Sequence, residues 1–158
     1  MGLLLTACTP EAEPTAEPIY DDIAAPLNIS SIEFCSEEPR GDRNYSVQPD
    51  ATYQMNDIVY YYFEVFISTS KRVENGYEIW VKITEFRLFN PEDTMIMNIS
   101  EYGEVHETLD YVPVYFWFWF CFEIAADQPP GQYRIEVVAT DMLSGRKGTQ
   151  TAYFSRQV

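Results

Sequence analysis

From residue 28 onward, apolar and polar residues alternate with a period of two, instead of recurring every three or four positions. A period of two places successive side chains on opposite faces of an extended strand, whereas a helix needs a period of about 3.6 residues. The apolar positions are rich in β-branched and aromatic residues, which pack well on a pleated surface. The pattern predicts about seven or eight strands and no helix longer than a turn. The expected strands cover residues 29–34, 58–67, 77–89, 94–99, 111–124, 132–141 and 146–156.

Polar segments with turn-forming residues separate these strands. Asn75-Gly76 is a strong hairpin signal, and residues 90–93 carry a proline at the second position of a tight turn. The acidic segment 100–110 is expected to cross the end of the sheets as a loop. Near Glu85 the apolar residues change from one face to the other, which indicates a β-bulge or a break between two short strands.

Strands separated by turns every 8–12 residues or so favour an antiparallel β-sandwich. The C-terminal part adds a resemblance, carried by Pro130-Gly131-Gln132-Tyr133, Asp141-Met142-Leu143-Ser144-Gly145 and Ala152-Tyr153-Phe154. This series is similar to the one found in prokaryotic (archaeal or bacterial) immunoglobulin-like surface domains. The resemblance implies that residues 28–158 form an exported immunoglobulin-like β-sandwich. It assigns no function, because adhesins, enzyme accessory modules and structural proteins share this fold.

The N-terminus contains Leu5-Thr6-Ala7-Cys8, which resembles the lipobox of prokaryotic surface lipoproteins. The resemblance implies that residues 1–7 are the remnant of a signal peptide and that Cys8 becomes the lipid-modified first residue. Lipid on Cys8 would anchor the protein to the outer face of the cell membrane or envelope. The membrane is thus one expected partner.

Residues 8–27 have the composition of an acidic, proline-rich tether. Prolines alternate with aspartate and glutamate, and large apolar residues are few. Proline favours extended polyproline conformations and like charges repel, so such a segment extends. It would reach on the order of 55 Å from lipid to folded domain.

The charge of the chain limits its partners. Lysine and arginine number 10 against 25 acidic residues, for a formal net charge of −15. Nucleic acid is therefore not an expected partner, because no basic face is available to neutralise phosphates. Apolar residues make up 46% of the chain, which is ample for a core.

The chain has three cysteines, an odd number that cannot all pair in disulfides. If lipid occupies the sulfur of Cys8, an even number remains. Cys35 and Cys121 then remain, in a compartment that permits oxidation. Two alternatives stay open: a disulfide between them, or two free thiols that behave as small apolar residues.

Three Asn-x-Ser triplets begin at Asn28, Asn44 and Asn98. In a host that glycosylates asparagine, these residues would be surface attachment sites.

Residues suited to catalysis or metal binding are scarce. His106 is the single histidine, and its neighbours do not resemble a nucleophile motif. No Cys-x-x-Cys or paired histidines indicate zinc, and the acidic segments 90–93 and 101–104 do not match a calcium loop. We therefore expect no catalytic residues, no metal and no cofactor.

The least usual segment is 111–122, which reads Tyr-Val-Pro-Val-Tyr-Phe-Trp-Phe-Trp-Phe-Cys-Phe. Alternation places its valines and phenylalanines on one face, expected in the core, and its tyrosines, tryptophans and cysteine on the other. Strand 58–67 carries a similar outer row, so the two strands would build an aromatic platform if they are neighbours. The candidate binding face comprises Tyr60, Tyr62, Tyr115, Trp117 and Trp119.

Three interpretations of this face are open. The chain itself covers it, through the tether or the segment 100–110. A protein partner or a second copy covers it through tyrosine and tryptophan anchors. Finally, sugar rings stack on it.

Together these features favour a non-enzymatic, lipid-anchored cell-surface module for adhesion, envelope structure or partner docking, with an unknown protein or glycan partner. One alternative is a carbohydrate-binding module that uses the aromatic sheet face. Another is an accessory or chaperone-like domain that pairs a free sheet edge with another chain.

Overall fold

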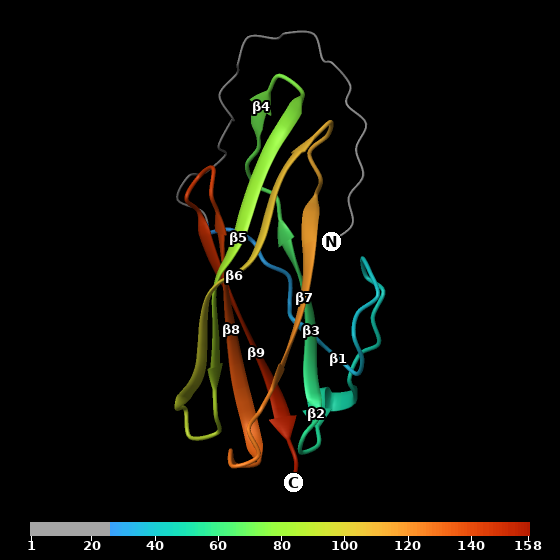
Figure 1. Ribbon diagram of the computed structural model, residues 1–158, viewed down its shortest axis with the longest axis vertical. Helices are drawn as coiled ribbons and strands as arrows, with labels where there is room; N and C mark the ends of the chain where they lie inside the picture. The colour runs from blue at the N-terminus through green and yellow to red at the C-terminus, as the bar shows by residue number, and fades with distance from the viewer. Residues whose placement is uncertain (1–25) are drawn as a thin grey trace.

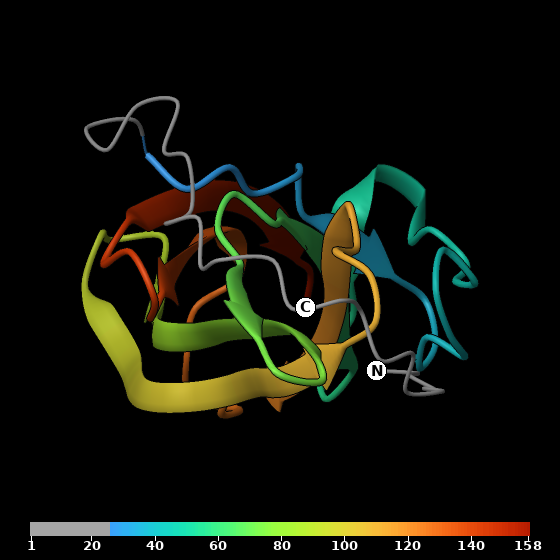
Figure 2. The same cartoon turned by 90° about the horizontal axis from the view of Figure 1, so that it is seen from above.

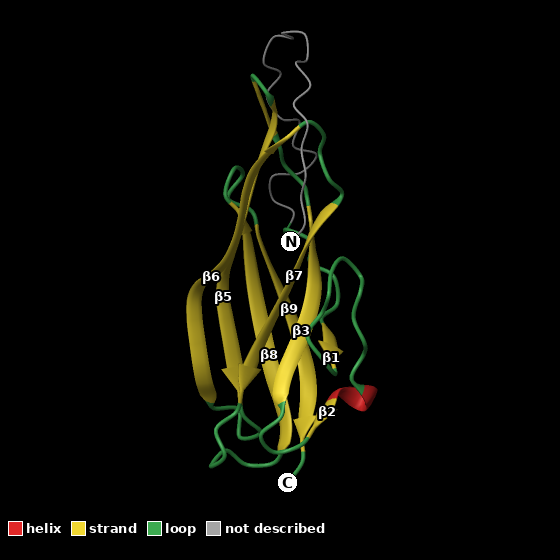
Figure 3. Cartoon of the chain, turned by 45° about the vertical axis from the view of Figure 1, so that its right-hand side comes forward, coloured by secondary structure: helices red, strands yellow, loops and turns green. Residues whose placement is uncertain are grey.

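The computed structural model describes residues 26–158, which form two β-sheets packed against each other (Figures 1 and 3). Cys8 and nearly all of the expected tether lie outside the described residues. A single 3-10 turn, Pro49–Ala51, interrupts the described strands. The strands are β1 (Glu33–Cys35), β2 (Thr52–Tyr53), β3 (Ile58–Phe66), β4 (Lys71–Val73), β5 (Gly76–Phe89), β6 (Met95–Leu109), β7 (Tyr115–Glu123), β8 (Gly131–Asp141) and β9 (Lys147–Arg156).

The smaller sheet has the order β1-β3-β7. The larger sheet has the order β2-β9-β8-β5-β4. Strands β8 and β4 pair with successive parts of one edge of β5, and β6 pairs with its other edge. Figure 2 shows the larger sheet curling around one side of the smaller one. The prediction of an all-β chain in two sheets is therefore confirmed.

Aromatic residues fill the space between the sheets. Tyr61 and Phe63 of β3 are fully buried, as the alternation along 58–67 predicts. The Tyr61 ring stacks on Phe86 of β5, with centroids 5.7 Å apart, and Phe63 stacks on Phe118 of β7 at 5.6 Å. Burial of a large apolar side chain such as that of Phe63 contributes about 1.5–3 kcal/mol, so this layer stabilises the packing of the two sheets.

The change of apolar phase near Glu85 marks a β-bulge. Ile83 pairs with Ala139 of β8, and Glu85 pairs with the next residue, Val138, so Thr84 is the extra residue on β5. The pairing with β6 shifts at the same place. The bulge lets one long strand keep apolar side chains inward on both sides of the shift.

The prediction of a loop over residues 100–110 is wrong. Most of this segment is the second half of β6, paired with β5 as far as Leu109 opposite Tyr77. Val105 and Leu109 are buried, whereas Glu101, Glu104 and Glu107 are exposed. Acidic residues on the solvent side of an edge strand discourage pairing with other chains, so an acidic composition is compatible with a strand here.

Three further details differ from the sequence-based expectation. The described residues contain nine strands, because β2 and β4 are too short to leave a periodic signal. β2 also pairs with β9 in parallel, so the arrangement is not purely antiparallel. Finally, β7 begins at Tyr115, after Pro113, which has no N–H to donate. Val112 and Val114, expected in the core, are consequently exposed.

The first described residues connect the two sheets. The Leu27 N–H donates to the Lys147 carbonyl at the start of β9, at 3.0 Å, and the Phe66 N–H of β3 donates to the Asn28 carbonyl, also at 3.0 Å. Ile29 then forms a bridge with Val65. The segment that would continue from the tether is thus fastened to both sheets.

Candidate ligand-binding groove

The two aromatic rows expected from the sequence are neighbours on the outer face of the smaller sheet. Strands β3 and β7 pair along their whole length, with Tyr62 opposite Trp119 and Glu64 opposite Trp117. Directly opposite residues of an antiparallel pair point to the same face. The condition for an aromatic platform, that these strands be adjacent, is therefore met.

Residues 36–47, which we call the covering loop, fold over part of this platform. The loop leaves β1, turns at Gly41–Asn44 and returns to form a bridge between Val47 and Cys35. Pro39 is buried in it. The chain therefore covers its own aromatic face in part, but with this loop and not with residues 100–110.

A cluster of polar side chains fastens the covering loop to the sheet. Arg43 Nε donates to Glu64 Oε2 at 2.9 Å, and Arg43 Nη2 donates to Glu64 Oε1 at 3.0 Å. The Arg43 backbone N–H donates to the Tyr62 hydroxyl, at 3.1 Å. The hydrogen bonds to Glu64, and then the charge of its carboxylate, raise the pKa of the Arg43 guanidinium above its ordinary value. A two-point contact of this kind fixes orientation as well as distance.

The same loop limits which platform residues a ligand can reach. Tyr62 is 2% exposed, because the Tyr45 ring lies over it with centroids 4.5 Å apart. The Tyr115 hydroxyl donates to both carboxylate oxygens of Asp42, at 3.0 Å. Of the five candidate residues, Tyr62 is therefore hidden and Tyr115 is engaged by the loop.

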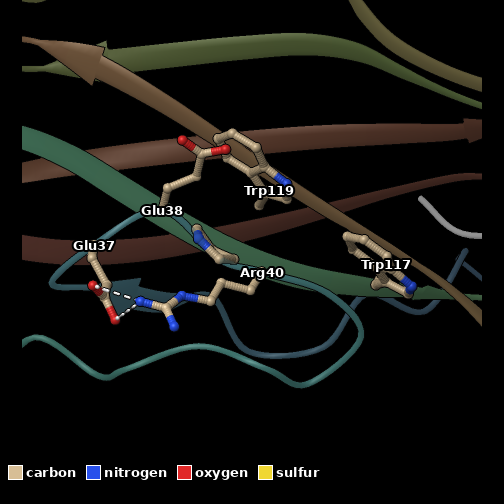
Figure 4. A pocket seen from close by; sticks show the side chains of 6 residues that line it. Glu37, Glu38, Arg40, Trp117 and Trp119 are labelled. Carbon is tan, nitrogen blue, oxygen red and sulfur yellow. Dashed lines mark hydrogen bonds and ion pairs between the residues drawn. The ribbon is translucent and has the colours of Figure 1, made fainter.

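Beyond the fastened part of the loop, the two tryptophans line an open groove of about 620 Å³. Trp117 and Trp119 form one wall, on β7, and the start of the covering loop forms the other (Figure 4). The lining residues are Glu37, Glu38, Pro39, Arg40, Trp117 and Trp119.

Tyrosines of the neighbouring strand β3 pack beside the tryptophans on the same face. The Trp117 ring is stacked on Tyr62, with centroids 6.3 Å apart and planes inclined by 18°. Trp119 packs against Tyr60, with centroids 6.4 Å apart. Both indoles remain partly exposed, so each keeps apolar surface for a ligand.

On the loop side, charges of both signs face the groove. The Arg40 guanidinium extends toward Glu37 and contacts both carboxylate oxygens at 3.5 Å (Figure 4). Glu38 forms no hydrogen bond or ion pair with another described residue. The groove therefore offers hydrogen-bond donors and acceptors next to two apolar ring faces. Sequence reasoning missed these loop residues, since nothing in Ser-Glu-Glu-Pro-Arg distinguishes it from an ordinary polar loop.

Cys35 and Cys121 are free thiols. Both are paired with Tyr60 of β3, from opposite sides, so they lie two strands apart. Two strand spacings are roughly 9–10 Å, whereas a disulfide requires Cα atoms within about 7 Å. Of the two alternatives left open by the sequence, the structure has two free thiols and no disulfide between them.

The three candidate glycosylation residues are all exposed. Asn28 and Asn44 lie outside the named strands, and Asn98 lies on β6 opposite Arg87. Each is accessible, and none lines the groove.

His106 belongs to a cross-strand cluster. It lies on β6 opposite Trp80 of β5, and the two rings stack with centroids 4.2 Å apart. His106 Nε2 is 2.8 Å from Glu78 Oε1, and the Trp80 indole N–H donates to Glu104 at 2.7 Å. These contacts give His106 a structural role on the surface of the larger sheet.

Within residues 26–158, no cluster of three or more histidine, cysteine, aspartate or glutamate side chains is arranged to hold a metal ion. The same residues contain no helix of sufficient length and apolar character to span a membrane.

Comparison with known proteins matches this chain to no protein-family model. It also matches no curated protein.

Proposed function

We propose that this protein is a non-enzymatic binding module of the cell surface, which holds its partner in the groove between Trp117, Trp119 and residues 37–40. The observation that carries the proposal is the partial cover of the aromatic platform. The covering loop is fastened over Tyr62 and Tyr115 yet leaves both tryptophans partly exposed beside it. Concave sites with apolar rings and a few polar groups are typical of ligand binding.

The proposal also includes an anchor. Lipid on Cys8 would attach the module to the outer face of the membrane or envelope, and residues 8–27 would hold it clear of the surface. This part is supported by the lipobox resemblance and by the acidic prolines that follow it. Intact mass of the protein from its host should show a lipid-modified chain that begins at Cys8. A mature chain that retains Met1, or a soluble one, would reject the anchor.

We further propose an immunoglobulin-like domain. Two packed sheets support it, together with the C-terminal hairpin in which buried Tyr133 stacks on Phe154, with ring centroids 5.3 Å apart. Both residues belong to the motif that carries the resemblance.

Binding to isolated host envelope tests the groove. Wild-type protein should sediment with the envelope, and Trp119→Ala should lower the apparent affinity about tenfold, as expected when an aromatic anchor is removed. Trp80→Ala is the matched control, because Trp80 lies on β5 outside the groove. Equal binding by all three proteins, or no binding, would reject the proposal.

A second candidate function follows from the sheet edges. In the described residues β6 pairs with β5 alone and β7 with β3 alone, so each has an edge to which another chain could add a strand. On β6 this applies to residues 95–99, which carry no acidic side chain. Ile99→Lys places a charge on exposed β6 and should abolish envelope binding if this edge is used. Unchanged binding by Ile99→Lys would leave the groove as the site.

A further inference from the structure

The chemistry of the groove identifies the class of its ligand. Resting on the function proposed above, we propose that the groove binds a neutral carbohydrate, with sugar rings on the Trp117 and Trp119 indoles and hydroxyl groups toward Glu37, Glu38 and Arg40.

The indoles provide the apolar half of the site. Trp117 and Trp119 are two positions apart on β7, so they share one face and are separated by about 6.5–7 Å along the strand. The face of an indole is electron-rich and attracts weakly positive C–H groups. A pyranose ring presents such a C–H face, and consecutive rings would meet consecutive indoles.

The loop provides the polar half. The Arg40 guanidinium can donate hydrogen bonds to a ligand, and the carboxylates of Glu37 and Glu38 can accept hydrogen bonds from it. The Glu38 carboxylate accepts no hydrogen bond from another described residue, so it can accept from a ligand without first losing one. A ring bordered by hydroxyl groups, each of which both donates and accepts, satisfies such a mixed set.

The charges argue against ionic ligands. Arg40 contacts Glu37 within the groove, so a cation would be attracted mainly by Glu38 and would be repelled by Arg40. An anion would meet two carboxylates and a chain of net charge −15. A purely apolar ligand would strip water from all three charged groups without replacing their hydrogen bonds. A neutral polar ligand avoids each of these costs.

The size of the groove is also suitable. Its volume of about 620 Å³ lies within the range of roughly 300–1,000 Å³ typical of sites for small molecules. An oligosaccharide segment of a few rings fits such a space.

Selective destruction of the envelope's components tests the proposal with the full-length protein. One portion of host envelope is oxidised with periodate, which cleaves vicinal diols of sugars, and another is digested with protease. The binding that Trp119→Ala lowers about tenfold should disappear after periodate and survive protease. Glu38→Gln keeps the side chain's shape and should weaken the same binding severalfold, whereas Trp80→Ala should behave as wild type.

Results that overturn the carbohydrate can be told apart from a result that rejects the proposed function. Groove-dependent binding that survives periodate and disappears after protease would assign a protein partner and overturn the carbohydrate. Displacement of the protein by pentalysine would assign a cationic ligand and overturn it too. The absence of any binding that depends on Trp119 would instead reject the proposed function itself.

Discussion

Arg43 holds Glu64 through two hydrogen bonds, of 2.9 and 3.0 Å, across the outer face of the smaller sheet. Glu64 is 7% exposed, so its carboxylate needs the hydrogen bonds that Arg43 and the Tyr62 hydroxyl donate to it. We predict that Arg43→Ala releases the covering loop: amide hydrogen exchange should accelerate in residues 40–45 and the free energy of unfolding should fall. Hydrogen exchange followed by mass spectrometry measures the first effect.

Arg40→Ala is the control for this prediction. Arg40 is exposed and its guanidinium pairs only with Glu37 among the described residues, at 3.5 Å, so its removal should leave exchange in residues 40–45 unchanged. If the two variants exchange at the same rate, the Arg43–Glu64 pair does not hold the loop.

The two described cysteines should differ sharply in reactivity. Burial, reinforced by Glu33, raises the pKa of the Cys35 thiol to about 12. The pKa of exposed Cys121 is raised as well, by partial desolvation and then by Glu38 and Glu123. Because the thiolate is the reactive form, iodoacetamide at about pH 8 should label Cys121 slowly and Cys35 only after unfolding. Mass spectrometry of the labelled peptides assigns the positions, and a linked Cys35–Cys121 peptide would contradict the structure.

Alkaline pH should unfold the protein. Burial raises the pKa of Tyr53 and Tyr102 above the ordinary value for tyrosine, so in the folded protein both phenols keep their protons beyond the point, about pH 10, at which the unfolded chain loses them. The free energy of unfolding should stay level to about pH 9 and then fall by about 1.4 kcal/mol per pH unit for each such phenol.

Urea unfolding at a series of pH values measures this slope. Tyr53→Phe should have a shallower decline above pH 10 or so than wild type, since one protonation difference is gone. A free energy that does not change between neutral and strongly alkaline pH would show that these phenols titrate alike in both states.

Gly148 permits the first described residues to fasten onto β9. A Cβ at this position would lie 1.9 Å from the Leu27 carbonyl oxygen, which is backbone and cannot move aside cheaply. Gly148→Ala should therefore destabilise the protein by about 1–3 kcal/mol, as forced overpacking does.

Gly41→Ala is the matched control, because a Cβ there meets no atom within 4 Å. Its effect should stay within about 0.5 kcal/mol. Thermal unfolding of both variants measures the difference, and equal melting temperatures would mean that Leu27 is not packed on Gly148.

The sequence predicts the strands well where alternation is strong. Tyr61 and Phe63 lie in the core as expected, and the phase change near Glu85 marks a real bulge. The sequence could not predict that the two aromatic rows are adjacent. Alternation shows which face of a strand a residue occupies, but it does not show which strand lies beside it.

The groove itself could not be predicted in the same way. It depends on the covering loop, and this loop is placed by Arg43 reaching Glu64, which is 21 residues away in the chain. Two polar residues that meet across such a distance leave no period or motif. Segment 100–110 was predicted to be a loop for a related reason. The glutamates of an exposed edge strand give it the same composition as a polar loop.

The indole N–H signals in a proton–nitrogen NMR spectrum test the central claim most directly. The chain has three tryptophans, and each gives one such signal. Trp117 and Trp119 line the groove, whereas the Trp80 indole donates to Glu104 on the larger sheet and serves as an internal control. On titration with glycan released from the host envelope, the Trp117 and Trp119 signals should shift together and saturate while the Trp80 signal stays in place. Three stationary signals, or a shift of Trp80 alone, would contradict the groove as a carbohydrate-binding site.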